Sequence, residues 1–84
     1  MILEVIKAEY VSDYQIHLWF NNGENITVNL KDTIFKDHRK IFQPLRELEY
    51  FKKFQLTFDT LGWDNGLDLA PEYLYELGLK NELN

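Results

Sequence analysis

Two runs of alternating apolar and polar residues, separated by a tight-turn sequence, constrain the fold of this chain more than any other feature. The alternation covers residues 14–20 and 26–30, and the sequence Asn-Asn-Gly stands between them at 21–23. A period of two is typical of β-strands that bury one face, and Asn and Gly tolerate the positive φ of a tight reversal. With the preceding run 3–11, which ends at the turn pair Ser12-Asp13, the pattern predicts a three-stranded antiparallel meander.

The middle of the chain predicts less regular structure. Residues 34–42 are mixed and predict a loop with one helical turn, and Pro44 favours the start of a short helix. Residues 54–58 alternate Phe, Leu and Phe with polar residues and predict a fourth strand. Residues 61–63 predict a short fifth strand before the turn sequence Asp-Asn-Gly.

The end of the chain carries the clearest helix signal. Pro71 suits a first helical position, Leu74 and Leu77 share a face, and Gly78 is typical of a left-handed C-terminal cap. The helix is therefore expected to end near Gly78, with residues 80–84 frayed. The predicted fold class is α+β, with an antiparallel sheet of about four to five strands, one short middle helix and a C-terminal helix.

Length and composition favour one folded domain. The 84 residues suffice for a single hydrophobic core. A hydrophobic share of 45% and an aromatic share of 15% are those of a soluble globular domain. No internal repeat and no linker rich in Pro, Gly or Ser divides the chain. We therefore expect one domain over residues 1–84.

Charge is distributed unevenly along the chain. The formal net charge of -5 argues against a general nucleic-acid binder, because the phosphate backbone is held chiefly by Lys and Arg. Residues 1–35 hold two Lys and five acids, residues 36–53 six cations and three acids, and residues 54–84 one Lys and six acids, so the local sums are -3, +3 and -5. A basic partner is expected to meet the segment from Asp59 to Glu76. The basic middle keeps a DNA-associated accessory role as an alternative.

The residue inventory excludes several kinds of chemistry. The chain has no Cys, which rules out disulfides, thiolate metal sites and cysteine nucleophiles. His17 and His38 lack the paired spacing of metal ligands, and Asp64, Gly66 and Asp68 do not match a calcium loop. No phosphate-binding Gly run, dinucleotide fingerprint or nucleophile elbow occurs. We therefore expect no metal, no cofactor and no catalytic residue, and we expect that the chain is not an enzyme.

No stretch of the sequence predicts secretion or membrane insertion. The first residues include an acid at the fourth position and lack a long apolar run, so they do not predict a signal peptide. No run approaches the roughly 20 apolar residues of a membrane span. A cytoplasmic protein that does not bind membranes is the expectation.

Trp19 interrupts the alternation of its strand. Its register places it on the face of Gln15 and His17, opposite the apolar face of the strand. The side chain therefore either covers a second small core or lies exposed as an interaction anchor.

One block near the end of the chain combines a Trp, a turn sequence, an Asp and a helix start, in the order Trp63-x-Asn65-Gly66-x-Asp68-Leu69-x-Pro71-Glu72-x-Leu74-Tyr75. This block resembles the bacterial domain of unknown function family 2442, together with Tyr14-x-Ile16-x-Leu18-x-Phe20-x-x-Gly23, Phe42-x-Pro44-Leu45 and Phe51. The resemblance extends to about Leu77 and implies an α+β domain with antiparallel strands and a terminal helix. Two positions depart from the family pattern: Asp64 stands where Pro is common, and Ala70 stands where a capping side chain is expected.

The resemblance also implies a kind of function. Some members are small stand-alone proteins encoded beside another small protein, which suggests a toxin–antitoxin arrangement, and the family offers no catalytic residue. Our leading hypothesis is a non-enzymatic protein-interaction module, antitoxin-like, whose partner is a small basic protein or a second copy of the chain. The candidate partner-binding residues are Trp19, Trp63, Asp64, Asn65, Asp68, Glu72 and Tyr75. A small-ligand or enzymatic site in the Trp63–Glu72 region is the alternative.

Substituting Ser or Asp for Ala70 is expected to raise the free energy of unfolding by roughly 1 kcal/mol. Ala70 immediately precedes the helix start and offers no side-chain acceptor to the free amides of the first turn. Urea unfolding of Ala70→Ser measures the effect, and a midpoint that stays in place or falls would contradict this helix boundary.

Overall fold

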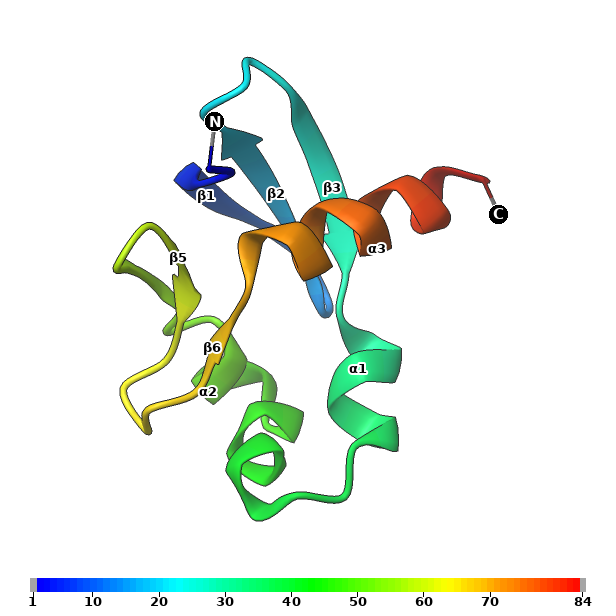
Figure 1. The fold of residues 1–84 in the computed structure, drawn as a ribbon. Helices are drawn as coiled ribbons and strands as arrows, with labels where there is room; N and C mark the ends of the chain where they lie inside the picture. Colours follow the sequence, from blue (N-terminus) through cyan, green and yellow to red (C-terminus); the bar gives the residue numbers. More distant parts are fainter. Residues whose placement is uncertain (1, 84) are drawn as a thin grey trace.

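The predicted meander is confirmed in a computed structural model that describes residues 2–83. Its strands are β1 (Val5–Ser12), β2 (Gln15–Phe20) and β3 (Asn25–Asn29), antiparallel and in the order β1-β2-β3 (Figure 1). Asp13 at φ 48° and Gly23 at φ 87° supply the left-handed conformations that the two turns require. The β2–β3 register is regular, whereas β1 has irregularities between Val5 and Lys7 and between Tyr10 and Ser12.

The prediction of a single middle helix is wrong. Among the described residues, the segment contains α1 (Lys31–Lys36), the 3-10 helix η1 (Lys40–Arg46) and α2 (Leu48–Phe51). Pro44 lies inside η1 instead of starting an α-helix, and Glu47 is extended at φ -80° and ψ 116°. Short pieces form because each one turns a separate apolar residue into the core, including Ile34, Phe42 and Phe51.

The expected single sheet of four to five strands is also wrong. Within residues 2–83, β4 (Gln55–Thr57), β5 (Thr60–Gly62) and β6 (Asp68–Leu69) form a second three-stranded antiparallel sheet. The backbone amide of Val5 donates to the carbonyl of Asp59 at 2.9 Å, so the second sheet meets the edge of β1. The irregular register of β1 begins at this point, and a bulged edge does not continue a regular ladder.

The predicted fourth strand, 54–58, is too long at its end. β4 stops at Thr57, and Phe58 and Asp59 form the turn to β5 with φ 51° and 67°. Two successive positive φ values are the geometry of a tight hairpin turn. Phe58 therefore leaves the apolar face on which the alternation of Phe54, Leu56 and Phe58 would place it.

The terminal helix α3 (Pro71–Leu83) starts where the sequence predicts and ends later. The amide of Leu74 donates to the carbonyl of Ala70 at 3.1 Å, which confirms Ala70 as the residue before the first turn. The expected end at Gly78 is wrong because Gly78 lies inside the helix, where it permits close packing: a Cβ there would stand 2.8 Å from Cγ2 of Ile26. Fraying of residues 80–84 stays a prediction, and Asn84 lies outside the described residues.

One buried cluster joins both sheets and the helices. The inner face of the meander supplies Ile16, Leu18 and Val28, which are fully buried, and α3 crosses this face at β3 (Figure 1). The segments after α1 add a further set of buried residues to the cluster, namely Phe42, Leu45, Phe51, Leu61, Trp63, Leu67, Leu69 and Leu74. The meander therefore depends on the later segments to cover its apolar face.

Gly78→Ala is expected to lower the free energy of unfolding by about 1–3 kcal/mol, the usual cost of overpacking, even though Ala is intrinsically the better helix former. The added methyl group would meet three atoms of the buried Ile26 side chain at 2.8 to 3.1 Å. Chemical denaturation measures the loss, and Glu76→Ala on the exposed face of α3 is the control, with a change within about 0.5 kcal/mol.

The double variant Gly78→Ala with Ile26→Ala tests the contact itself. Because Ile26→Ala removes the atoms that the new methyl group would meet, the two losses should sum to more than the double variant shows. Additive losses would contradict a steric role for Gly78.

Candidate functional site

Trp19 lies on the outer face of the meander, opposite the face that α3 covers. Its side chain is half-buried, with Nζ of Lys7 4.7 Å above the ring and the His17 ring edge-on at 4.5 Å. Trp19 is therefore neither in a second core nor fully exposed, because two polar neighbours shield it.

The His17 side chain belongs to a hydrogen-bonded network on the same face. Its Nδ1 lies 2.7 Å from Oγ1 of Thr27 and its Nε2 lies 2.8 Å from Oδ1 of Asn25. A neutral imidazole satisfies both contacts if Nε2–H donates to Asn25 and the Thr27 hydroxyl donates to Nδ1. Both ring nitrogens are thus occupied by neighbours on β3, which gives His17 a structural role.

Trp63, a candidate partner-binding residue by its sequence, is a core residue. Its side chain is only 4% exposed, and its indole N–H donates to the carbonyl of Phe51 at 3.0 Å. The ring also packs against the Phe51 ring at 5.9 Å between centroids. The sequence alone does not decide where Trp63 lies, because a Trp beside a turn is compatible with both the core and the surface.

Asp64 and Asn65 fasten the β5–β6 turn to the helical segment. Oδ1 of Asp64 accepts a hydrogen bond of 2.6 Å from the Tyr50 hydroxyl, which raises the pKa of Tyr50 above its usual value. The Asn65 side chain donates to the carbonyl of Ile41 at 2.9 Å and accepts from the amide of Leu67 at 3.1 Å. Both side chains are exposed but already paired.

The other three candidates lie apart from that turn. Asp68 is exposed and borders a hollow of about 270 Å³ together with Thr33, Arg39 and residues near the start of α3. Glu72 is exposed. Tyr75 packs edge-on against Phe20 and donates its hydroxyl to Oε2 of Glu24 at 2.7 Å, a hydrogen bond that raises the pKa of Tyr75.

The seven candidates therefore do not form one surface, and the acids do not converge on one hollow. Asp68 borders the hollow near α3, whereas Asp64 bonds to Tyr50 and Glu72 is not among the lining residues. Across residues 2–83, no group of three or more His, Asp or Glu side chains is placed to hold a metal ion. In the same range, every helix is too short or too polar to cross a membrane.

Several cations of the basic middle lie beside carboxylates. Arg39 and Asp37 approach to 2.7 Å, Lys36 and Asp32 to 3.5 Å, and Lys52 and Glu49 to 3.8 Å. Each carboxylate would compete with a phosphate group for its cation. This arrangement does not favour the DNA-associated alternative.

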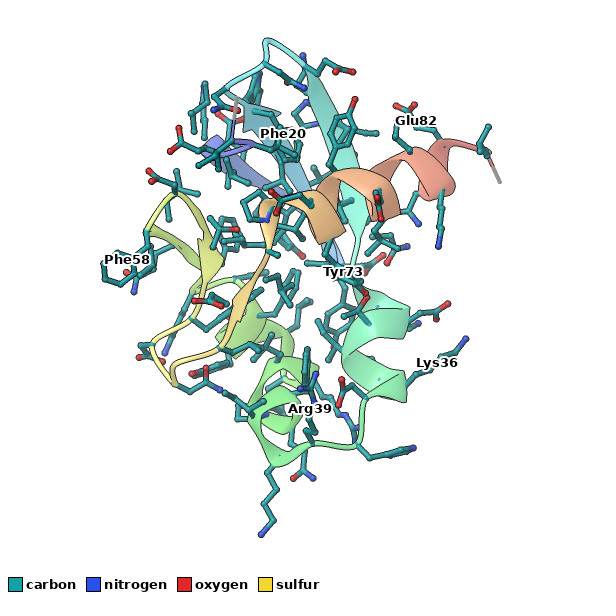
Figure 2. All side chains as sticks on the ribbon, viewed as in Figure 1. Phe20, Lys36, Arg39, Phe58, Tyr73 and Glu82 are labelled. Carbon is teal, nitrogen blue, oxygen red and sulfur yellow. The ribbon has the colours of Figure 1, made fainter. Side chains whose placement is uncertain are left out.

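Sequence reasoning missed the most exposed aromatic side chain of the described chain. Phe58 is 92% exposed at the β4–β5 turn and points away from the body of the molecule (Figure 2). Three further apolar side chains are exposed: Leu56 on β4 at 42%, Ile6 on β1 at 59% and Ile2 before β1 at 80%. Asp59 is a residue type that favours turns, whereas Phe58 itself gives no local indication of a left-handed turn.

The Asp37–Arg39 pair predicts an acid-sensitive loop. Side-chain and backbone hydrogen bonds from Arg39 lower the pKa of Asp37 from 3.8 to about 2. Because the folded-state pKa is depressed, the pair stabilises the fold above the ordinary carboxyl pKa and loses this contribution as pH falls through about 2. An NMR titration of the Asp37 carboxyl measures the value. Arg39→Gln should return it toward 3.8, and an unchanged titration would contradict the pairing.

Comparison with known protein families matches residues 5–79 to the family described as "Protein of unknown function (DUF2442)". Searches of curated proteins and of solved structures found no significant match. The match spans the meander, the helical segment, the second sheet and α3 as far as Leu79. The chain therefore belongs to the DUF2442 family of proteins of unknown function.

Proposed function

We propose that the chain is a non-enzymatic protein-interaction module whose partner docks on the β4–β5 turn. The observation that carries this proposal is the exposure of Phe58, a large apolar side chain that is 92% accessible to solvent. Aromatic side chains that enter a pocket of the partner commonly supply much of the binding energy of an interface.

The backbone under Phe58 supports a functional explanation. Phe58 has φ 51° and Asp59 has φ 67°. Asp tolerates this left-handed conformation, whereas for Phe it is uncommon and costs of order 1 kcal/mol or more. Gly would relieve the strain at position 58 and would remove the exposed ring. Strained residues cluster at active sites and ligand-binding sites, so the strain at Phe58 supports a binding role.

The surroundings of Phe58 support a partner of a particular chemistry. The backbone hydrogen bond between Val5 and Asp59 brings the turn next to β1, whose Ile6 is 59% exposed. Leu56 on β4 is 42% exposed, and Asp59 beside Phe58 in the turn carries an exposed carboxylate. An apolar centre with an acidic rim fits a partner that presents an apolar pocket bordered by cations.

We infer an antitoxin-like role, in which the chain binds a small basic protein encoded beside its own gene. The acidic sum of residues 54–84 supports a basic partner because opposite charges speed the encounter of two proteins. Self-association and a cytoplasmic location remain predictions, which light scattering and cell fractionation would test.

Phe58→Ala is expected to weaken the complex with the adjacent gene product by roughly tenfold or more, as removal of a central aromatic anchor does. Calorimetric titration of the two purified proteins measures the affinity. Val11→Ala is the control, because Val11 is also exposed, at 49%, but lies at the end of β1 away from the contact between Val5 and Asp59. Equal affinities for the wild-type chain and the Phe58→Ala variant would overturn the proposed site.

Phe58→Gly separates binding from folding. Because Gly accepts φ 51° without strain, this variant should unfold at an equal or higher denaturant concentration while it binds the partner as weakly as Phe58→Ala. A variant that loses stability along with binding would instead assign Phe58 a structural role.

A further inference from the structure

The edge of β3 that faces away from β2 has free backbone groups. Hydrogen bonds between Phe20 and Glu24 and between Leu30 and Tyr14 flank the β2–β3 ladder, so residues 26 and 28 direct their backbone groups toward β2. Residues 25, 27 and 29 consequently direct theirs outward. Among the described residues, the backbone groups of Asn25 and Thr27 on this side have no hydrogen-bond partner.

The edge has no Pro, charge or bulge of its own to block strand addition. The sequence of β3 is Asn-Ile-Thr-Val-Asn, without Pro or a charged residue, and its register against β2 is regular. Proteins normally protect an edge strand with charges, Pro, bulges or a covering element. The protection here is a side chain, because Oδ1 of Asn81 on α3 accepts a hydrogen bond of 2.8 Å from the amide of Asn29.

A groove runs between this edge and the end of α3. It has a volume of about 440 Å³ and is lined by Gln15, Thr27, Asn29, Asn81 and Glu82. A second hollow of about 160 Å³ shares Asn29 and Asn81 with it and extends along the strand toward Lys31 and Asp32. The end of α3 extends beyond β3 (Figures 1 and 2). Residues of β3 and of α3 both line the groove.

We propose that this groove binds an extended, basic peptide segment that adds to β3 as a fourth strand of the meander. The inference rests on the proposed function, because a segment of the same basic partner would supply the strand. Main-chain hydrogen bonds to Asn25 and Thr27 would provide affinity, as in other cases of strand addition. The amide of Asn29 would exchange the Asn81 side chain for a carbonyl of the added strand.

Charge and space favour such a segment over a second copy of the chain. Glu82 is the one charged residue that lines the larger groove, and it fits a Lys or Arg of the added strand. A second copy would bring a β3 that has no cation between Asn25 and Asn29. It would also bring a second projecting α3 into the space that the first α3 borders.

The test uses two blocked octapeptides, Thr-Val-Lys-Val-Thr-Val-Lys-Val and the same sequence with Glu in place of Lys, added to isotope-labelled chain. The basic peptide should slow hydrogen exchange of the amides of Asn25 and Thr27 and should bind about tenfold more tightly than the acidic one, the effect of one well-placed ion pair. No slowing, or equal binding of both peptides, would overturn the proposal.

Three variants test whether the peptide binds in the groove. Glu82→Lys should reverse the preference between the two peptides, whereas Glu76→Lys, a control on the exposed face of the same helix, should leave the direction of the preference unchanged. Asn81→Ala should tighten binding, because it frees the amide of Asn29. Unchanged preference in Glu82→Lys or weaker binding in Asn81→Ala would place the peptide elsewhere.

Light scattering of the free chain tests the other possible occupant of the groove, a second copy of the chain. A dimer whose Thr27 amide is already protected from exchange would show that a second copy uses this edge and would overturn the proposal. The peptide assay does not involve Phe58, so failure of peptide binding leaves the test of the β4–β5 turn standing. Conversely, an unaffected Phe58→Ala complex would not alter the peptide result.

Discussion

The close packing of α3 against β3 is the contact on which the rest of the structure depends. The inner face of the meander carries Ile16, Leu18 and Val28, and the burial of this apolar face under α3 and the later segments supplies hydrophobic stabilisation. Gly78 allows the helix to approach Ile26 closely enough to exclude water. Because the helix continues past Gly78, the same contact carries Asn81 and Glu82 to the edge of β3, where they line the groove.

The two surfaces proposed for binding lie at opposite edges of the meander. The β4–β5 turn meets β1 through the backbone hydrogen bond between Val5 and Asp59, and the groove lies beside β3. Each surface includes an exposed carboxylate, Asp59 at one edge and Glu82 at the other. A basic partner long enough to reach across the sheet could therefore contact both edges, with an apolar pocket at one and an extended segment at the other.

Local patterns predicted the parts of the fold that are themselves local. The alternation around the Asn-Asn-Gly turn and the Pro at the helix start depend on backbone preferences of a few residues, and both features are present. The candidate site was harder to predict because exposure depends on which elements pack together. Trp63 and Phe58 illustrate this: the sequence made the Trp a candidate partner-binding residue and placed the Phe on an apolar strand face, whereas the structure buries the Trp and exposes the Phe.

The sequence by itself determined an α+β chain with a meander, a helix that starts at Pro71 and an acidic final third. Only the tertiary structure decided that the later strands form a separate sheet and that Gly78 lies within the helix. It also decided that Asp64 and Asn65 pair with the helical segment. The physical reason is the sequence separation of the residues involved, because strand alternation and helix caps depend on residues that are neighbours in the sequence. Edge pairing, close helix approach and burial depend on residues that are distant in the sequence.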